Sequence, residues 1–214
     1  TSGVSGLNIP VAVKYSAVTA SNQGGVASGA TTSLALTSMK YTAGGTQTTV
    51  TPSVSANTMT LAASVPTLSV NGTQATGLII GAENKVGEFT VTADAAGQIR
   101  VATTTFTLTS SGISTSTYSA ARIADGNTTV SGSSCSVSSS TVTCALGNYV
   151  LSAGQSKTFS LFATVNGTAQ ASVTVSVSSA LSAAGFLWDD NTGGSALSGS
   201  SIYNFPTNSY SIKQ

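Results

Sequence analysis

The chain has 214 residues with 7 basic and 6 acidic side chains, so only 6% of its residues are charged, against about 25% in an average soluble domain. It contains no histidine and two cysteines, which excludes imidazole catalysis, Ser–His–Asp triads, histidine metal sites and Cys-only metal clusters. A net charge of +1 argues against nucleic-acid binding, which needs a basic surface. We therefore expect a structural or binding protein that is not an enzyme and needs no cofactor or metal.

The N-terminal region shows no targeting segment. The chain begins at Thr1 without an initiating Met, a charged n-region or an apolar h-region, which we interpret as a mature secreted chain whose signal peptide has been removed, or as a trimmed piece. No apolar run reaches the 18 residues that a membrane-spanning helix requires. We therefore expect an extracellular or cell-surface protein without membrane insertion of the mature chain.

Residues 1–30 are expected to form a flexible leader, a candidate donor strand and a hinge. Residues 1–8 are rich in Gly and Ser, and residues 22–30 form a Gly-rich break. Between them, residues 9–20 alternate apolar and polar side chains, which is typical of half-buried strands. One face of this segment would carry Ile9, Val11, Val13, Tyr15 and Ala17.

The remaining residues read as short strands separated by turns. We expect residues 31–65 to form additional strands that pack on a sandwich, and residues 66–187 to form the main sandwich. We expect residues 188–214 to form a C-terminal tail that contains aromatic residues. The clearest alternation places Phe159, Leu161, Ala163 and Val165 on one face.

Turn-forming pairs interrupt these runs at intervals typical of a sandwich or barrel. Gly44-Gly45, Asn71-Gly72, Asp125-Gly126 and Asn166-Gly167 contain residues that tolerate positive φ. Since Asn166-Gly167 separates two alternating runs, we predict a hairpin over residues 157–178. The fold class predicted is all-β: an Ig-like or jelly-roll antiparallel β-sandwich with an N-terminal strand extension.

The two cysteines predict a disulfide. Folding the segment between Cys135 and Cys144 about Ser139-Ser140 places the cysteines opposite each other, with Val137 opposite Val142. Cross-strand neighbours of this kind satisfy the short Cβ–Cβ distance that a disulfide needs. A disulfide indicates an oxidising compartment, and free thiols are the alternative.

Three Asn-X-Thr sequons mark candidate glycosylation sites, at Asn71, Asn127 and Asn166. The alternative is that Asn-Gly and Asn-Thr pairs only form turns. The Ser/Thr-rich surface also permits O-linked glycans.

Clustered acidic residues offer two further candidates, each with a simpler alternative. Asp189-Asp190-Asn191 has oxygen ligands of the kind that hold calcium, but its spacing is also that of a turn. Glu83 and Glu88 would need to face each other across a sugar cleft to act as a glycosidase pair, and nothing in the sequence indicates such a cleft.

The scarcity of charge bears on how the sheet edges are protected. Monomeric β-proteins guard their edge strands with Lys, Pro, bulges or inward charges, and this chain has few charges and four prolines. One solution is that a strand of one subunit, residues 9–20, fills the edge of its neighbour. The alternative is that residues 9–20 form an ordinary first strand of their own sandwich.

Residues 65–190 resemble a β-sandwich domain found in secreted, Ser/Thr-rich surface proteins of candidate-phylum (Patescibacteria-type) bacteria. The resemblance implies an Ig-like or jelly-roll sandwich in an extracellular surface protein, and it carries over no catalytic residue. Pilins that exchange donor strands are similar in mechanism only, since a penultimate Tyr is absent. The segments that carry the resemblance are VPTLSV (65–70), VGEFTVTADAAGQIRVATTTFTL (86–108), ARIADGNTTV (121–130), YVLSAGQSKTFSLFATV (149–165) and GFLWDDNTGG (185–194).

Two functions follow as hypotheses. The first is a structural subunit of an extracellular filament, a homopolymer whose partners are copies of itself joined by donated β-strands. The alternative is a cell-surface adhesin or carbohydrate-binding module that recognises surface glycans or host cells. In that case Trp188, Tyr203 or Tyr210 would stack on sugars, although Trp188 is also suited to a core.

Overall fold

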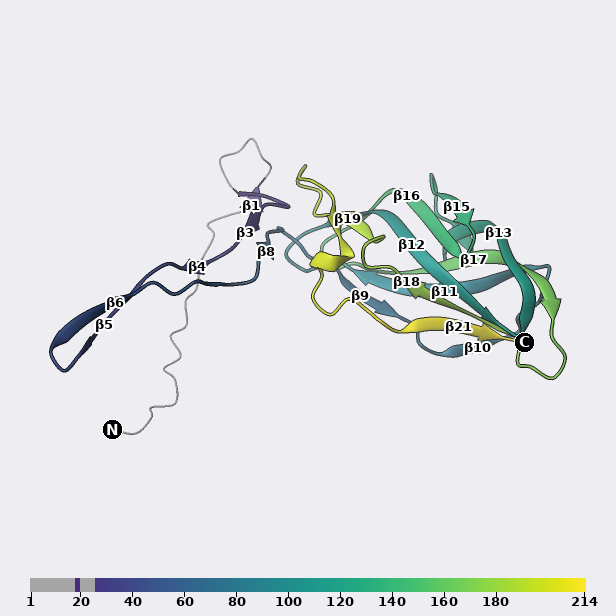
Figure 1. Ribbon diagram of the computed structural model, residues 1–214. Coiled ribbons are helices and arrows are strands. Elements are labelled where there is room, and N and C mark those ends of the chain that lie inside the picture. The colour runs from purple at the N-terminus through teal and green to yellow at the C-terminus, as the bar shows by residue number, and fades with distance from the viewer. Residues whose placement is uncertain (1–17, 20–25) are drawn as a thin grey trace.

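The computed structural model describes residues 18–19 and 26–214, and it is built almost entirely from strands (Figure 1). The strands that precede the sandwich are β1 (Val18–Thr19), β2 (Val26–Ala27), β3 (Thr31–Thr32), β4 (Ala35–Leu36), β5 (Met39–Ala43), β6 (Thr46–Val50), β7 (Val54–Ser55) and β8 (Met59–Thr60). The strands of the sandwich are β9 (Thr67–Val70), β10 (Gln74–Thr76), β11 (Glu83–Thr92), β12 (Ile99–Ser111), β13 (Ile113–Asp125), β14 (Thr128–Thr129), β15 (Ser134–Ser138), β16 (Thr141–Leu151), β17 (Ser156–Ala169), β18 (Ser176–Leu181), β19 (Leu187–Asp189), β20 (Leu197–Ser198) and β21 (Ser209–Lys213). A single turn of 3₁₀ helix, η1 (Gly199–Ser201), follows β20.

Two sheets pack face to face to form the sandwich (Figure 1). One has the strand order β10-β21-β18-β12-β16-β15, with β19 and β20 attached to β12, and the other has the order β14-β13-β17-β11-β9. β10 and β21 pair in parallel, and the other pairings of the sandwich are antiparallel. The predicted all-β antiparallel sandwich is therefore confirmed.

The core lies between the two sheets and is rich in aromatic side chains. Phe89 lies at its centre, with its ring centroid 5.4 Å from that of Phe159 and 5.6 Å from that of Phe106. Each fully buried side chain of this size contributes about 1.5–3 kcal/mol through the hydrophobic effect. The alternation predicted for residues 157–165 is confirmed, because the inward-facing residues of β17 are fully buried: Phe159, Leu161, Ala163 and Val165.

The hairpin predicted over residues 157–178 is wrong. β17 continues through Asn166-Gly167 and pairs with β13, whereas β18 lies in the other sheet. Gly167 has a φ of +139°, and a Cβ added there would lie 2.5 Å from Cγ2 of Ile113. The glycine is thus required because β13, whose register shifts nearby, approaches closely, and the Asn-Gly pair forms no turn between the runs.

The C-terminal residues are an integral part of the sandwich, in contrast to the tail predicted for residues 188–214. β21 lies between β10 and β18, and its residues Tyr210 and Ile212 are buried. β19 pairs with β12, which brings Trp188 into the core. The sequence did not predict these pairings, because a short strand contains too few residues to indicate which strands it pairs with.

Residues 31–60, here called the ribbon, form a long two-stranded hairpin. Its three ladders join β3 to β8, β4 to β7, and β5 to β6. The predicted turn at Gly44-Gly45 is present, with φ values of +58° and +81° that suit a two-residue hairpin turn. Figure 1 shows the ribbon extending away from one end of the sandwich. This differs from the expectation that residues 31–65 pack on the sandwich, because the ribbon strands pair with one another.

Candidate binding surfaces

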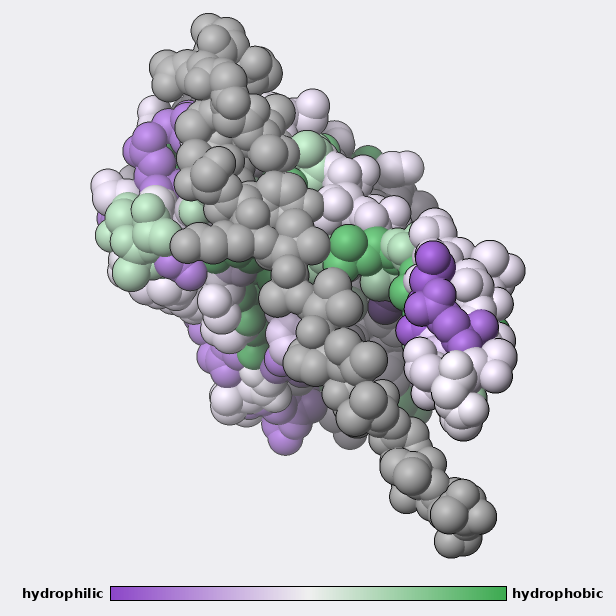
Figure 2. All heavy atoms as spheres, turned by 90° about the vertical axis from the view of Figure 1, so that its left-hand side faces the viewer, coloured by the Kyte–Doolittle hydropathy of each residue, from purple (hydrophilic) through white to green (hydrophobic). Residues whose placement is uncertain are grey.

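The ribbon exposes apolar side chains that a free two-stranded hairpin cannot bury. Val54 is 62% exposed and Tyr41 is 46% exposed. Figure 2, which views the ribbon end of the molecule, shows green hydrophobic atoms between paler and purple regions. Exposed apolar patches mark contact sites more often than scattered single residues do. The large exposed apolar side chains of the ribbon are Leu36, Met39, Tyr41, Val54 and Met59.

A buried carboxylate fastens the base of the ribbon to the sandwich. Oδ2 of Asp190 accepts a hydrogen bond from the backbone N–H of Ala63 at 2.7 Å, and Oδ1 accepts from the Thr192 hydroxyl at 2.6 Å. Burial alone would raise the pKa of Asp190, but the neighbouring Ser28 hydroxyl, Thr192 and the Ala63 amide together hold it below its ordinary value. The Ser64 hydroxyl adds a bond to the Gly97 carbonyl at 2.8 Å.

The acidic turn at Asp189-Asp190-Asn191 is structural. Asp189 forms an ion pair with Arg100, with 2.7 Å between Oδ2 and Nη2, and its Oδ1 accepts from the Asn191 amide at 2.8 Å. Among residues 18–19 and 26–214, no group of three or more acidic, Cys or His side chains is placed to hold a metal ion. The two carboxylates accept hydrogen bonds within the turn and at the base of the ribbon, as the turn interpretation expects.

Glu83 and Glu88 are each engaged in an ion pair on the outer face of one sheet. Arg122 holds Glu83 through two bonds of 2.7 and 2.8 Å, and these bonds lower the pKa of Glu83. Lys85 binds Glu88 at 2.6 Å. Burial alone would raise the pKa of Glu88, but the bonds from Lys85 and Asn71 hold it below its ordinary value. Both carboxylates are thus ionised partners of cations, which does not suit the proton-donating member of a glycosidase pair.

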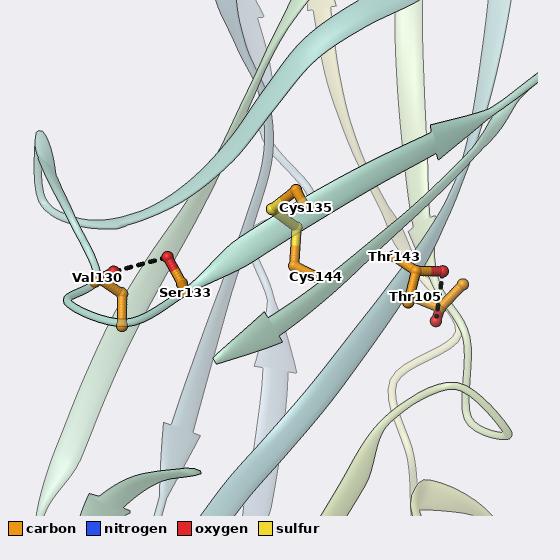
Figure 3. The surroundings of a disulfide bond; sticks show 6 residues. All are labelled: Thr105, Val130, Ser133, Cys135, Thr143 and Cys144. Atoms are coloured by element: carbon orange, nitrogen blue, oxygen red, sulfur yellow. Dashed lines mark hydrogen bonds between the residues drawn. A yellow bond between two sulfur atoms is a disulfide. The ribbon is translucent and has the colours of Figure 1, made fainter. Parts of the chain in front are cut away.

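The predicted disulfide between Cys135 and Cys144 is confirmed (Figure 3). The two cysteines are directly opposite in the β15–β16 ladder, with Val137 opposite Val142 as expected. The turn between these strands has a positive φ of 55° at Ser139. Because β15 is the last strand of its sheet, the disulfide fastens an edge strand that would otherwise depend on one ladder of hydrogen bonds.

The three sequons occupy different environments. Asn71 and Asn127 lie exposed in turns, although the Asn71 amide donates to Glu88 at 2.8 Å. Asn166 lies inside β17, half-buried, and its amide donates to the Ser119 hydroxyl at 3.1 Å. Glycosylation therefore stays a prediction, and its geometry is more favourable at Asn127 than at Asn166.

The aromatic residues proposed for sugar stacking are mostly unavailable to a ligand. Trp188 is 1% exposed and its Nε1 donates to the Ser198 carbonyl at 3.3 Å. Tyr210 is also buried, whereas Tyr203 is 90% exposed. The core interpretation of Trp188 is thus correct. Of the three aromatic residues, Tyr203 alone is exposed to a ligand.

An open groove lies between the start of β13 in one sheet and the end of β12, Val137 of β15 and the β15–β16 turn in the other. It encloses about 660 Å³, and its walls include Leu108, Tyr118 and Val137. This groove was not predicted from the sequence, because its walls come from three segments that only the sandwich brings together. The alternation of Phe106 with Leu108 was the one local sign that this part of β12 faces inward.

The candidate donor strand stays a prediction. Its residues Ile9, Val11, Val13, Tyr15 and Ala17 lie outside the residues that the structure describes. Among the described residues, no helix has the length and apolar character needed to cross a membrane.

Comparisons with known proteins give no family. No protein-family model matches the chain, and no curated protein matches it. One partly similar solved structure is a chain of the CaDoc0917–CaCohA2 complex, with 14% identity over 70% of this chain and 99% of that chain and a TM-score of 0.37. Another is the collagen-binding domain from a Staphylococcus aureus adhesin, with 10% identity over 73% of this chain and 100% of that domain and a TM-score of 0.28. These values are too low to bear on function, and the sandwich is established by its own strand pairing.

Proposed function

We propose that the chain is a non-enzymatic, extracellular binding module of a cell surface that contacts another protein through its ribbon. The observation that carries this proposal is the exposure of Leu36, Tyr41 and Val54 on a hairpin that projects from the sandwich. An isolated two-stranded hairpin is at best marginally stable in water. Covering its apolar side chains with a protein surface would stabilise the hairpin and the contact together.

Three further observations support the proposal. A disulfide is typical of secreted and surface proteins, and this one fastens an edge strand of the sandwich. Glu83 and Glu88, the two acidic residues considered for catalysis, are each held in an ion pair. The ribbon is anchored at its base by Asp190, so a contact made along its length is transmitted to the sandwich.

The ribbon favours a protein partner over a glycan. Sugar sites combine aromatic platforms with polar groups, whereas the aliphatic side chains Leu36, Met39 and Val54 suit an apolar protein surface. Of the aromatic residues considered for stacking, Trp188 and Tyr210 are buried. The experiment must therefore distinguish binding to a protein from binding to a glycan.

The test is binding of the fluorescently labelled full chain to intact cells, before and after their surface is treated with protease or with glycosidases. The proposal expects binding that protease abolishes and glycosidases spare. It also expects a Leu36→Ser/Val54→Ser variant to bind at least tenfold more weakly, while Val150→Ser, an exposed Val of the sandwich, is the matched control. Undiminished binding by the ribbon variant, or loss of binding with glycosidases alone, would contradict the proposal.

A second candidate function is a structural subunit of an extracellular filament assembled by strand donation. A separate observation favours it: the groove between the two sheets beside Tyr118 is open and partly apolar. Electron microscopy of concentrated full chain would test it, with regular fibres expected and dispersed particles as the contrary result.

A further inference from the structure

One carboxylate on the outer face of the sandwich binds an amine and an amide at the same time. Oε2 of Glu88 lies 2.6 Å from Nζ of Lys85, and Oε1 accepts a hydrogen bond from Nδ2 of Asn71 at 2.8 Å. The amine of Lys85 and the amide of Asn71 therefore lie against the same acid–base group. An amine, a carboxamide and a carboxyl group that can transfer protons between them are the components needed to form a new amide bond.

A bulge in β11 places Lys85 and Glu88 on the same face of the sheet. In a regular strand, residues three positions apart point to opposite faces. The pairing of β11 with β17 shifts register between Lys85 and Gly87, and an extra residue of this kind resets the alternation. Val86 and Gly87 are buried, whereas Lys85 and Glu88 are partly exposed. The bulge thus brings the amine and the carboxylate together.

Backbone contacts hold Asn71 opposite Glu88. β9 ends at Val70, which pairs with Phe89, and the next backbone N–H, that of Asn71, donates to the Glu88 carbonyl at 3.3 Å. Oδ1 of Asn71 accepts from the Thr73 N–H at 3.1 Å, which fixes the orientation of the amide. The same N–H would stabilise the negative charge that develops on Oδ1 when a nucleophile attacks Cγ.

The side chains of this cluster are partly sheltered from water. The Glu88 side chain is 19% exposed, and Nζ of Lys85 lies 5.6 Å from the ring centre of Tyr210, a buried residue of β21. The hydrogen bond to Glu88 raises the pKa of Lys85, so the ion pair is the resting state. Transfer of one proton along that bond gives a neutral amine and a neutral acid, a pair that burial favours relative to water.

We propose that Lys85 and Asn71 become joined by an isopeptide bond, formed within the chain with Glu88 as the group that transfers protons. The lone pair of Nζ attacks Cγ of Asn71, the new N–C bond forms, and the bond from Cγ to Nδ2 breaks. Nζ starts as an ammonium group and ends with one hydrogen. Glu88 carries the two protons that Nζ loses to Nδ2, which departs as ammonium, and Glu88 ends as a carboxylate. The reaction needs no oxidant, reductant or cofactor and takes place once in each chain.

Contact with one carboxyl group replaces an encounter between separate molecules. Well-oriented groups within one molecule react as if each were present at about 10⁵–10⁸ M. Because the amide product is stable, it accumulates even when the reaction is slow. Lys157 provides the contrast, since it forms an ion pair with Asp125 at 2.5 Å, and the side-chain hydrogen bonds of that pair within the described residues include no amide.

The bond would fasten β9, the last strand of its sheet. β9 pairs with β11 over only 4 residues. It also follows the ribbon in the chain, so a pull on the ribbon reaches the sandwich at this strand. The disulfide fastens β15, the last strand of the other sheet. One covalent bond would thus hold an edge of each sheet, whether or not the ribbon has a partner.

The first test is the intact mass of the reduced full chain. The wild type is expected to be lighter than its sequence by one ammonia, about 17 Da. Lys85→Arg keeps a positive charge beside Glu88 but lacks the reactive amine, so it should have the full sequence mass. Glu88→Gln and Asn71→Ser should have it as well. Lys157→Arg is the matched control and should show the same loss as the wild type.

Digestion with trypsin locates the bond and distinguishes it from a succinimide, which Asn71-Gly72 can form with loss of the same ammonia. Trypsin does not cleave after an acylated lysine. Residues 41–100 should therefore remain one fragment, lighter by about 17 Da, and should not separate into 41–85 and 86–100. Chymotryptic cleavage after Leu78 should leave two peptides joined. A succinimide would open in mild alkali and would persist in Lys85→Arg.

A wild-type chain with its full sequence mass would overturn the proposal. Separate tryptic fragments 41–85 and 86–100, or a loss of ammonia that persists in Lys85→Arg, would overturn it as well. Retention of the bond in Glu88→Gln, shown to be folded by circular dichroism, would overturn the role of Glu88. If Glu88→Gln does not fold, Lys85→Arg, which keeps an ion pair with Glu88, gives the same decision about the bond. Binding to cells through the ribbon should be equal in Lys85→Arg and wild type, so failure of the ribbon contact and failure of the cross-link are distinguishable.

Discussion

The sandwich and the ribbon contain similar residues but bury them to very different extents. In the sandwich, alternate side chains of β17 meet a second sheet and are fully buried, as Phe159 is. In the ribbon, the same kind of alternation places Tyr41 and Val54 on a hairpin that no second sheet covers. Period-two alternation thus predicts a strand, whereas burial depends on whether another layer lies above that strand.

The sandwich and the ribbon also differ in how many charged side chains they carry. The outer face of the β13-β17-β11 sheet holds the Glu83–Arg122 and Lys85–Glu88 ion pairs, and Arg122 also lies 4.1 Å above the ring of Phe162. The ribbon contains Lys40 as its one charged residue. Few charges guard the ribbon edges against pairing, so the ribbon is the region better suited to contact another protein.

The largest contrast is expected between a core and a ribbon aromatic residue. Phe159→Ala should lower the free energy of unfolding by about 3–5 kcal/mol, because it opens a cavity beside Phe89 and Tyr149. Tyr41→Ala should change it by less than about 0.5 kcal/mol, as exposed substitutions usually do. Urea unfolding monitored by circular dichroism measures both, and equal losses would show that the ribbon is buried in solution.

Removal of the disulfide should have the next largest effect. A Cys135→Ala/Cys144→Ala double variant should lose about 2–3 kcal/mol of stability, because the unfolded chain regains the entropy of a short closed loop. Val137 should then show faster amide hydrogen exchange than residues at the centre of β12. Exchange that accelerates only in the ribbon would contradict the role assigned to the disulfide at the sandwich edge.

Asp190 should control the joint between the two regions in a pH-dependent manner. Its pKa in the folded protein lies below the ordinary value of 3.8, so its stabilisation is fully present above that value and disappears as the pH falls through the folded pKa. Asp190→Asn should therefore cost about 1–3 kcal/mol at neutral pH, where the bonds to the carboxylate are lost. The difference between variant and wild type should shrink in acid.

Hydrogen exchange at Ala63 gives the local readout for this joint, because its amide donates to Asp190. Exchange there should accelerate in the Asp190→Asn variant and in acid, while Leu161 in the core should stay protected. A variant as stable and as protected as wild type at neutral pH would show that the joint contributes nothing.

The smallest effect on stability is expected at the ribbon surface. Leu36→Ser should leave the free energy of unfolding within about 0.5 kcal/mol of the wild-type value, since Leu36 contacts no core. Thermal unfolding checks this prediction. A large loss would show that the ribbon side chains are already covered in the isolated chain.

Local patterns were sufficient for several elements. The alternation around Phe159 predicted the buried face of β17, and the spacing of Cys135 and Cys144 about Ser139-Ser140 predicted both the disulfide and its register. The Gly44-Gly45 turn was also predicted. Each of these features depends on residues close together in the chain, so the local sequence contains the information.

Features that join distant segments were predicted poorly. Asn166-Gly167 has the composition of a hairpin turn, yet Gly167 serves the close approach of β13. β21 lies between β10 and β18, and the Ala63 amide donates to Asp190. Neither contact could be predicted from the sequence of one of the segments that take part in it. The groove beside Tyr118 has the same origin, since β12, β13 and β15 each supply one wall.

Composition, alternation and cysteine spacing act over a few residues, and they were therefore sufficient to predict an all-β, weakly charged chain with one disulfide. Which of the alternating strands are covered could not be predicted in this way. Burial requires a second layer, and the pairing of strands far apart in the chain places that layer over β17 and leaves Tyr41 and Val54 of the ribbon in water.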